Sequence, residues 1–435
     1  MVVTTLGASL GGARENDVRR VVFASLVGST IEWYDFFLYG VVAGIVFNKL
    51  YFPMHDPTIS VLLAYATFAV GFVARPLGGV IFGHFGDRIG RKTMLVITLL
   101  LMGGATVLIG LLPTYDQIGI LAPILLLLLR VAQGIGIGGE WGGAVLMAYE
   151  FAPESKRGFY ASIPQIGLSL GLFMASGVMA LLTMMPDAQF MAWGWRAAFV
   201  ASIILVVLGT WIRSNIGESP EFKKAKAESR ARDQGLPFMD MLKRYPGNVV
   251  LGMGARYIDG VFFNVFAVFS ILYLTKYVGL ERTFALWTVC SAAIVMVFCI
   301  PLFGRLSDRI GRPRIYAVGS LLLALSVFPA FWLMSSGNPV LVVLGIALPF
   351  GVVYPMCYGP EAALFADLFD PSVRYTGVSF VYQFSGIFAS GITPMIATAL
   401  MAANDNDPFW LCAYVAFAAL VSFVSAVLIG RRARA

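Results

Sequence analysis

The sequence predicts an all-α membrane protein with twelve transmembrane helices in two pseudo-symmetric six-helix bundles. Its composition, its series of apolar segments and a repeat between its two halves support this prediction. Of the 435 residues, 59% are hydrophobic and 13% are charged, whereas about 25% of residues are charged in soluble domains. The mean hydropathy is +0.81. This composition excludes a water-soluble enzyme, a disordered chain and a fibrous protein.

Twelve apolar segments are long enough to cross a bilayer, which takes roughly 20 mostly apolar residues per helix. Segments 93–115, 283–304 and 408–430 contain no charged residue. The charge-free stretch 315–360 fits two spans, separated by the turn-forming residues 335–339. The predicted spans are 21–48, 58–83, 93–113, 118–149, 158–183, 195–213, 247–277, 283–304, 314–335, 339–367, 374–401 and 408–430.

The basic residues mark one side of the membrane. Of the 31 Lys and Arg residues, 24 lie before the first span, after the last span, in the loops that follow even-numbered spans or at the span ends that border these loops. Cytoplasmic loops carry the Lys and Arg excess, so both termini are predicted to be cytoplasmic. This placement explains the formal net charge of +7 without a nucleic-acid partner.

The chain is predicted to divide into five regions. Residues 1–20 are a cytoplasmic tail without the apolar core of a cleaved signal peptide. Residues 21–213 form the first six-helix bundle and residues 247–430 form the second. The Lys/Glu/Arg-rich stretch 214–246 is a cytoplasmic linker with a surface helix near 219–232, and residues 431–435 are a short cytoplasmic tail.

A loop motif occurs twice, at a spacing of 221 residues. The second predicted span is followed by Gly83-His84-Phe85-Gly86-Asp87-Arg88-Ile89-Gly90-Arg91, and the eighth by Gly304-Arg305-Leu306-Ser307-Asp308-Arg309-Ile310-Gly311-Arg312. The shared pattern is G-x-x-x-D-R-I-G-R, and Glu140 and Glu361 are separated by the same spacing. Internal repeats of this kind are typical of membrane transporters.

With this loop motif the chain resembles the major facilitator superfamily, and motifs in the first half narrow the resemblance to the metabolite:proton symporter family. These motifs are Glu32-Trp33-Tyr34-Asp35-Phe36, Tyr39-Gly40, Arg75-Pro76-Leu77-Gly78-Gly79, Arg130-x-x-Gln133-Gly134-x-Gly136-x-Gly138-Gly139-Glu140-Trp141-Gly142-Gly143 and Gly194-Trp195-Arg196. The second half shares mainly the loop motif and Arg374-Tyr375-x-Gly377. The resemblance implies the two-bundle fold and proton-coupled uptake of a metabolite by alternating access.

Charged residues inside the predicted spans are the candidate functional residues, because a charge at mid-bilayer costs roughly 2.5–3.5 kcal/mol. Helical spacing predicts three polar faces: Glu32, Asp35, Phe36 and Tyr39 in the first span; Arg130, Gln133 and Trp141 in the fourth; Arg256, Asp259 and Phe263 in the seventh. Two interpretations stay open. Either the pairs Asp35–Arg130 and Arg256–Asp259 hold the bundle together, or these residues line a central cavity.

Asp35 is the candidate proton site. Burial and a nearby arginine have opposite effects on the proton affinity of a carboxyl group, so moving Arg130 away would switch proton binding. The family resemblance agrees, since related symporters place a proton-coupled Asp of the first span opposite an Arg of the fourth. Glu32, one turn earlier, either shares the proton or lies at a mouth of the pathway.

Arg75, Arg130 and Arg256 are the candidate anion-binding residues, because a guanidinium binds a carboxylate with two parallel hydrogen bonds. In the carboxylate carriers of the family an Arg precedes the Pro-Leu/Ile-Gly-Gly run, as Arg75 does here. Anchoring of a helix end by Arg75 and a structural pair for Arg256 are the alternatives. Further candidates for hydrogen bonding or stacking with a substrate are Gln133, Tyr39, Trp141, Gln165, Asn264, Tyr354 and Gln383.

The resemblance also implies a cytoplasmic gate at the two loop motifs. Asp87 is expected at a helix N-terminus of the opposite half and Arg91 beside Glu150. Asp308, Arg312 and Asp367 are expected to do likewise in the second half. The complete predicted gate is Gly83, Asp87, Arg88, Gly90, Arg91, Glu150, Gly304, Asp308, Arg309, Gly311, Arg312 and Asp367.

The sequence therefore predicts a secondary transporter and not an enzyme, since it contains no catalytic or metal-ligand set. We expect a monomer in the lipid bilayer that imports a small organic acid, such as shikimate, an aromatic acid or a di- or tricarboxylate. The proton is the expected coupling ion, without a cofactor. A zwitterionic osmolyte such as betaine or proline is the alternative substrate.

One motif match is misleading. Gly134-x-Gly136-x-x-Gly139 fits the dinucleotide-binding pattern, but that pattern must follow a β-strand. Here it lies inside an apolar span, so the glycines are expected to permit close packing of helices.

Overall fold

The computed structural model describes residues 2–89, 91–138, 141–214, 237–371 and 373–432, without the side chains of 2–21, 80, 83–95, 147, 151, 213–214 and 237–240. Within these ranges every regular element is a helix. Eleven helical segments of the described chain are long and apolar enough to cross a membrane. The apolar helix Val96–Leu111 stands at the place of the third predicted span. These observations confirm an all-helical, multi-span fold.

The first half contains the helices that correspond to spans one to six. They are α1 (Val2–Val42) with its extension η1 (Ala43–Phe47) and α2 (Asn48–Leu50), α3 (Pro57–Ile89), α4 (Arg91–Leu111), α6 (Leu121–Ile137) with α7 (Trp141–Phe151), α8 (Arg157–Leu182), and α10 (Trp195–Ser214). Short elements between them are α5 (Tyr115–Ile118), η2 (Glu154–Lys156), α9 (Asp187–Gln189) and η3 (Phe190–Gly194).

The second half repeats this order. It contains α12 (Pro237–Arg244), α13 (Pro246–Asn264) with η4 (Val265–Phe269), α14 (Ser270–Leu272) and η5 (Tyr273–Tyr277), α15 (Arg282–Ile310), α16 (Arg312–Ser335), α17 (Pro339–Ile346) with η6 (Ala347–Val353) and α18 (Pro355–Ala366), α19 (Arg374–Gly386) with η7 (Ile387–Gly391) and α20 (Thr393–Ala403), and α21 (Phe409–Arg432).

Several spans are interrupted by wider, π-helical turns. These turns are η1 in span one, η4 and η5 in span seven, η6 in span ten and η7 in span eleven. Such turns release backbone groups from the regular ladder and are frequent at functional sites. Inside a membrane, irregular backbone is tolerated only where protein or a polar cavity surrounds it. The interrupted spans are therefore expected at the centre of the molecule.

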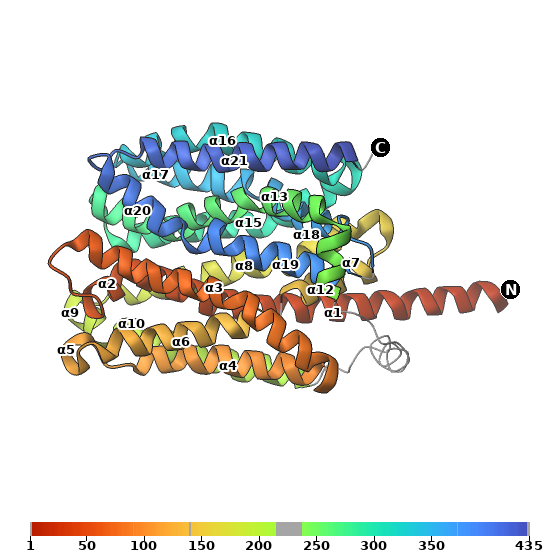
Figure 1. Cartoon of the computed structure of the whole chain (residues 1–435), viewed down its shortest axis with the longest axis horizontal. Coiled ribbons are helices and arrows are strands. Elements are labelled where there is room, and N and C mark those ends of the chain that lie inside the picture. Colours follow the sequence, from red (N-terminus) through yellow and green to blue (C-terminus); the bar gives the residue numbers. More distant parts are fainter. Residues whose placement is uncertain (1, 90, 139–140, 215–236, 372, 433–435) are drawn as a thin grey trace.

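The helices run side by side, and the two halves meet along two seams (Figure 1). One seam joins α8 to α15 and α18, and the other joins α3 to α19, η7 and α20. The early turns of α1 and the last turns of α21 lie at the same end of the bundle, here called the termini end (Figure 1). The short helices α2, α5 and α9 lie at the opposite end.

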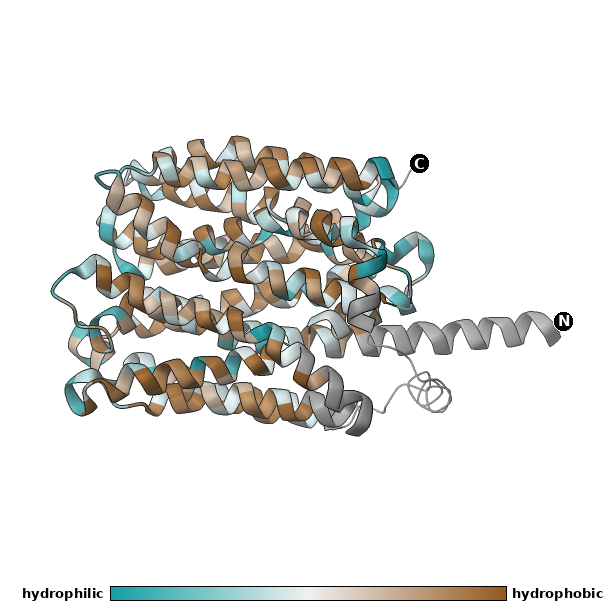
Figure 2. Ribbon diagram, viewed as in Figure 1, coloured by the Kyte–Doolittle hydropathy of each residue, from teal (hydrophilic) through white to brown (hydrophobic). Residues whose placement is uncertain are grey.

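The outer surface is apolar between the two ends, as a lipid-facing surface must be. Large side chains such as Trp332 and Phe298 are 74% and 72% exposed. Figure 2 shows hydrophilic residues gathered at both ends of the bundle and mainly hydrophobic helices between them.

The fourth predicted span corresponds to α6 and α7, and residues 139–140 between them lie outside the described residues. The helix boundaries differ from the sequence prediction in two places. The first helix already begins at Val2, so residues 2–20 of the predicted tail are helical. Part of the linker forms α12, which was not predicted, whereas the helix predicted near 219–232 lies outside the described residues.

Candidate functional site

Arg75 lies inside the first half, between aromatic rings. It precedes Pro76 in α3 and is 2% exposed. Its guanidinium carbon lies 4.2 Å from the centre of the Phe36 ring and 4.3 Å from that of Phe72. The Nε and Nη2 atoms make no hydrogen bond within the described chain, although the carboxylate of the buried Glu32 acts on the guanidinium electrostatically. Arg75 is therefore part of the interior and not a helix-end anchor.

Arg130 lies in α6, the helix packed against α3, and its guanidinium is also surrounded by aromatic rings. It is fully buried, and its guanidinium carbon lies 4.2 Å from the Tyr39 ring centre and 4.4 Å from that of Phe36. Nη1 donates to Gln133 Oε1 at 3.1 Å, and Gln133 Nε2 donates to Thr106 Oγ1 at 2.8 Å. Phe36 thus lies between the two arginines and separates their charges.

Asp35 does not pair directly with Arg130, so the structural pair, one of the two interpretations left open by the sequence, does not hold for these residues. Its carboxylate is 1% exposed and faces the hydroxyls of Thr106 in α4 and Ser202 in α10. Neither carboxylate oxygen makes a hydrogen bond of good geometry with the described residues. The Arg130 guanidinium lies against aromatic rings instead, so Gln133 and Thr106 stand between the two charges. In this conformation Asp35 and Arg130 are therefore connected only indirectly, through Thr106 and Gln133.

The second half holds an arginine with two carboxylates. Arg256 Nη1 forms an ion pair with Asp259, as its i+3 spacing suggests, and Nε lies 3.3 Å from Glu361 Oε1. The Tyr354 hydroxyl donates to Asp259. All of these side chains are buried. This cluster carries two acids for one base.

The repeat relates the two clusters. Asp35 and Arg256 are 221 residues apart, the same spacing as the two loop motifs. The corresponding positions of helices one and seven thus carry opposite charges. We conclude that the two halves share a backbone plan but contribute different chemistry to the centre.

An aromatic stack joins the two halves beside Arg256. The Trp141 ring of α7 lies 3.4 Å from the Tyr382 ring of α19, at an interplanar angle of 12°. The Arg256 guanidinium carbon lies 4.2 Å from the Tyr382 ring centre. In the next position, Gln383 Nε2 donates to the Gly138 carbonyl at 3.1 Å. Trp141 and Gln383 therefore lie at the junction of the halves.

The remaining predicted polar residues are also buried. Gln165 of α8 reaches across the seam, where Nε2 donates to the carbonyls of Tyr358 at 2.9 Å and Gly359 at 3.3 Å. Asn264 donates to the Gly260 carbonyl of its own helix at 2.8 Å. The amide oxygens of Gln165 and Asn264 have no hydrogen-bond partner in the described part of the chain.

Gly134 of the misleading motif and the adjacent Gly138 pack helices together. A Cβ atom on Gly138 would lie 1.9 Å from the Arg75 carbonyl oxygen, and one on Gly134 would lie 2.2 Å from the Gly71 carbonyl oxygen. Only glycine permits α3 and α6 to approach this closely. The contact fixes the two arginine-bearing helices relative to each other.

The second loop motif closes the termini end of the α8–α15 seam. Asp308 accepts hydrogen bonds from the backbone N–H groups of Gly158 at 2.7 Å and Phe159 at 2.9 Å, in the first turn of α8. A carboxylate at this place satisfies free donors and complements the helix dipole. The backbones are close, because a Cβ on Gly158 would lie 2.6 Å from the Gly304 carbonyl oxygen.

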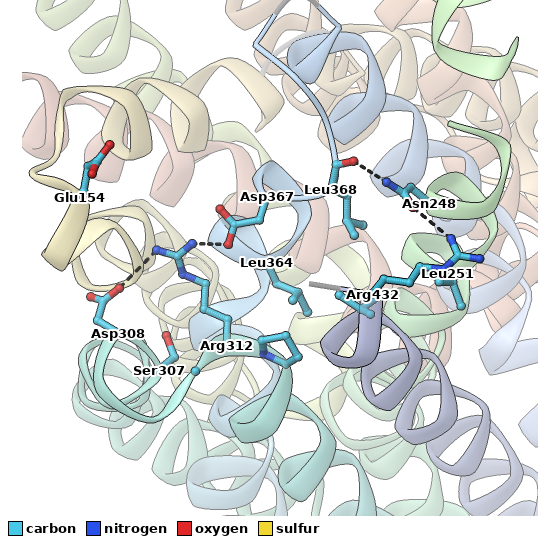
Figure 3. A pocket seen from close by; sticks show the side chains of 13 residues that line it. Glu154, Asn248, Leu251, Ser307, Asp308, Arg312, Leu364, Asp367, Leu368 and Arg432 are labelled. Atoms are coloured by element: carbon cyan, nitrogen blue, oxygen red, sulfur yellow. Dashed lines mark hydrogen bonds and ion pairs between the residues drawn. The ribbon is translucent and has the colours of Figure 1, made fainter. Parts of the chain in front are cut away.

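Tyr149 of α7 is the meeting point of the charged residues at the same end. Its hydroxyl donates to Asp367 Oδ1 at 2.5 Å, and Arg312 pairs with Asp367 and lies 3.4 Å from Asp308 (Figure 3). Arg374 pairs with Glu150 across the halves at 3.6 Å. Three guanidinium groups, from Arg157, Arg312 and Arg374, lie 4.8, 5.7 and 5.4 Å from the Tyr149 ring centre.

A pocket of about 440 Å³ opens beside this network (Figure 3). On its far side Asn248 Nδ2 donates to the Leu368 carbonyl at 2.7 Å, and Arg432 donates to Asn248 Oδ1 at 3.1 Å. Nearby, Tyr245 donates to Asp370, and this hydrogen bond raises the pKa of the Tyr245 phenol above its ordinary value. Apart from Glu154 of η2, its lining residues belong to the second half, and the buried arginines are not among them.

Contacts also join the two halves toward the opposite end, where a pocket of about 450 Å³ is lined from both halves. Thr183 of α8 and Thr283 of α15 are hydrogen-bonded at 3.0 Å. The Phe37 ring of α1 stacks on Phe263 of α13 at 4.9 Å. The polar centre is therefore enclosed between contacts at both ends.

Part of the predicted gate lies outside the described residues. This holds for Gly90 and for the side chains at Gly83, Asp87, Arg88 and Arg91. Of the second-half positions, Gly311 ends α15 with a φ of 108°, a conformation that favours glycine. Arg309 is exposed. Glu150 pairs with Arg374, which was not among the predicted gate residues.

Sequence reasoning missed three residues that the structure makes prominent. Glu361 was noted only for its spacing from Glu140, although a carboxylate inside an apolar span was itself a signal. Tyr382 and Tyr149 gave no such signal, because tyrosines are common in membrane helices. Their importance depends on contacts between the two halves.

These features define a membrane transporter with a buried polar centre between two helical halves. Residues 21–237 match the family described as Sugar (and other) transporter, and residues 251–435 match the Major Facilitator Superfamily. The chain belongs to the major facilitator superfamily.

Relatives and solved structures agree with this assignment. The chain is 39% identical to the Shikimate transporter of Escherichia coli K12, over 96% of this chain and 95% of that protein. It is 42% identical to the Inner membrane metabolite transport protein YhjE of the same organism, over 88% of each. The Proline/betaine transporter of Escherichia coli K12 is 32% identical, over 94% of this chain and 84% of that protein.

The fold is similar to that of the D-xylose–proton symporter. The TM-score is 0.72, at 18% identity, over 95% of this chain and 97% of that one. At this identity the likeness concerns the fold alone.

Proposed function

We propose that this protein is a proton-coupled symporter that imports a small organic acid, such as shikimate, an aromatic acid or a di- or tricarboxylate, by alternating access. The observation that carries the proposal is the group of three buried guanidinium groups, of Arg75, Arg130 and Arg256. The Nε and Nη2 atoms of Arg75 and Arg130 make no hydrogen bond within the described chain. A carboxylate is the partner that best satisfies such donors in a dry interior.

Aromatic surfaces around these arginines favour a ring-bearing acid. Phe36 and Phe72 face Arg75, and Tyr382 lies between Arg256 and Trp141. A flat ring with a carboxylate fits a site of stacking surfaces beside cations. The likeness to the Shikimate transporter agrees with this chemistry.

Proton coupling is assigned to Asp35, with Arg130 as its charge partner through Gln133 and Thr106. When a substrate carboxylate binds Arg130, the Gln133 bridge is released and the field at Asp35 becomes more negative. Asp35 then takes up a proton, which leaves the loaded centre closer to neutral. Glu32 beside Arg75 is proposed to share this role, since it is buried and lies within electrostatic range of that guanidinium.

The contacts at the two ends are proposed to alternate. The termini end, with Asp308, Arg312, Asp367, Tyr149 and Glu150, is assigned to the cytoplasmic side of a bacterial inner membrane. Opening there requires breaking the hydrogen bonds between Asp308, near the end of α15, and the first turn of α8. The working unit is proposed to be the monomer, because each chain encloses a complete centre.

A zwitterionic osmolyte such as betaine or proline is the second candidate substrate. It is supported by the 31–34% identity to transporters named for these compounds. Cationic ammonium groups also bind aromatic faces. Against it, a zwitterion has no net charge to offset the guanidinium groups of the first half.

A thermal-shift screen of the purified protein decides between the two substrates. Shikimate, aromatic acids, dicarboxylates, betaine and proline are compared at acidic and neutral pH. We expect stabilisation by an organic acid that is stronger at acidic pH, and uptake of that acid into cells that a protonophore abolishes. Stabilisation by betaine or proline alone would overturn the organic-acid assignment.

Arg75→Gln tests the anion site, with Arg282→Gln as the control. Loss of one partner of a buried charge pair costs about 2–5 kcal/mol, so affinity falls at least roughly 30-fold. Arg282 pairs with the largely exposed Asp187 at 3.7 Å near the opposite end, so its loss leaves affinity unchanged. Equal affinity in Arg75→Gln and wild type would exclude Arg75 from the site.

A further inference from the structure

We propose that Glu361 is a second proton-binding site, in the C-terminal half, and that it carries a proton in the conformation described above. The site consists of Glu361, Asp259 and Arg256. It is separate from Asp35, which lies between helices of the first half. The inference that Glu361 binds a proton does not require the proposed substrate, whereas its role in anion binding rests on the proposed function.

The charge balance supplies the first argument. Asp259 and Glu361 are 2% and 0% exposed, and Arg256 is the one cation within ion-pair distance of either in the described chain. Two ionised carboxylates would leave a net negative charge without solvent, which is a costly arrangement. One proton on the pair makes the cluster neutral.

Hydrogen bonding decides which carboxylate holds the proton. Asp259 accepts a hydrogen bond from the Tyr354 hydroxyl and forms an ion pair with Arg256 Nη1. Both contacts favour the charged form of Asp259. Both oxygens of Glu361 lack a hydrogen-bond partner among the described residues, and Arg256 Nε, 3.3 Å away, does not meet them with hydrogen-bond geometry. An unsupported carboxylate in a dry interior is neutral. Glu361 is therefore the protonated member.

Within the described chain, Arg256 and Asp259 are the ionised groups that act on Glu361, whereas the guanidinium of Arg75 acts on Arg256 and Tyr382. The titratable neighbours that act on Glu361 are Arg256 and Asp259 of α13, Tyr316 of α16, Tyr382 of α19, and Tyr354, Cys357 and Tyr358 of its own segment. From α8, Gln165 reaches the backbone of this segment, and α15 approaches it with the Ile300 carbonyl. The hydroxyls and the thiol of this set are neutral at physiological pH.

A proton at Glu361 makes anion binding at Arg256 possible. With the proton, Arg256 and Asp259 cancel, and an incoming carboxylate meets a neutral cluster. Without it, the cluster is negative and repels the same anion. Substrate binding in the C-terminal half is thereby linked to one proton, in addition to the one assigned to Asp35.

Infrared spectroscopy of the purified protein tests the site without a substrate. A protonated carboxyl group in a dry interior gives a carbonyl band apart from the ionised groups, and this band moves in D₂O. We expect the band in wild type, a shift of it in protein labelled with ¹³C-glutamate, and its loss in Glu361→Gln. The same measurement is made in Glu32→Gln, because Glu32 is also buried and is proposed above to share a proton, and the band of Glu361 should remain in this variant.

Three results would overturn the assignment. They are a band that ¹³C-glutamate does not shift, a band that persists in full in Glu361→Gln, and the complete loss of the band in Glu32→Gln. The labelled wild type and Glu32→Gln still test the assignment even if Glu361→Gln fails to fold.

The link to transport has a separate readout. One linked proton changes affinity by up to about tenfold per pH unit. We expect this dependence to weaken in Glu361→Gln, with affinity at neutral pH raised toward the acidic value. A Glu361 band in a protein that binds no organic acid would support the proton site and refute the proposed substrate. Unchanged pH dependence in Glu361→Gln would refute the link to transport.

Discussion

Replacing Asp308 by Asn is expected to open the termini end of the protein. The carboxylate accepts two backbone N–H groups of α8 at 2.7 and 2.9 Å, and this contact joins the two halves. Asn keeps one acceptor oxygen but loses the charge. The change removes one charged hydrogen bond, of about 1.5–3 kcal/mol, and a helix-dipole interaction of about 0.3–1 kcal/mol. The closed state is thus destabilised by roughly 2–4 kcal/mol.

A shift of this size is large enough to measure by spin-label distances. At 1.4 kcal/mol per tenfold, the ratio of closed to open molecules falls by roughly 30- to 700-fold. Labels at Lys156 and Arg309, which are exposed on opposite sides of the seam, report the distance between the halves. We expect a longer distance to dominate in Asp308→Asn, in a background without the native cysteines.

Glu154→Gln is the matched control for this experiment. Glu154 lies at the same end, but its side chain is 88% exposed and its contact with Arg157 is 3.8 Å long. Exposed pairs contribute roughly 0–1 kcal/mol, so the control should keep the wild-type distances. If Asp308→Asn and Glu154→Gln give the same distances as wild type, Asp308 does not hold this end closed.

Three further predictions concern closure and coupling. Gly158→Ala places a Cβ 2.6 Å from a carbonyl oxygen of α15, so the same labels should report an open termini end, whereas Gly104→Ala, with nothing within 4 Å, should change nothing. Tyr149→Phe removes the bond to Asp367 and should weaken closure by about 0.5–1.5 kcal/mol, seen as a smaller shift in the same distances; wild-type distances would argue against the bond. Asp35→Asn should abolish accumulation of substrate in vesicles with a proton gradient but keep exchange without one; full accumulation would remove Asp35 from the coupling.

The general plan of the fold was predictable from the sequence because a membrane-spanning helix requires a long apolar segment, which the amino-acid composition reveals. Long apolar segments predict the helices, and the repeat predicts two related halves. The short helix α12 in the linker was not predicted, because a polar segment gives no hydropathy signal. The helical start of α1 was missed for a related reason, since polar residues before a span give no hydropathy signal.

The site was predictable in its members more than in its pairs. Arg75, Arg130 and Arg256 were found because a charge inside an apolar span is costly and therefore has a purpose. The direct pair Asp35–Arg130, one of two interpretations left open, was not found, because helical spacing shows which face a residue occupies but not which side chains lie between two faces. The stack of Trp141 on Tyr382 joins residues 241 positions apart, and no local pattern in one sequence reports such a contact.

The backbone contact of α3 with α6 has a consequence for how substrate preference can change. Glycines hold the backbones of these two helices in close contact. The distance between the backbone positions of Arg75 and Arg130 is therefore expected to stay constant during transport. If this distance is constant, the site can be adapted to a longer or shorter acid only through residues of the second half, in α13 and α19. Selection for new substrates should therefore yield changes around Arg256 and Tyr382, and leave Gly71, Gly134 and Gly138 untouched.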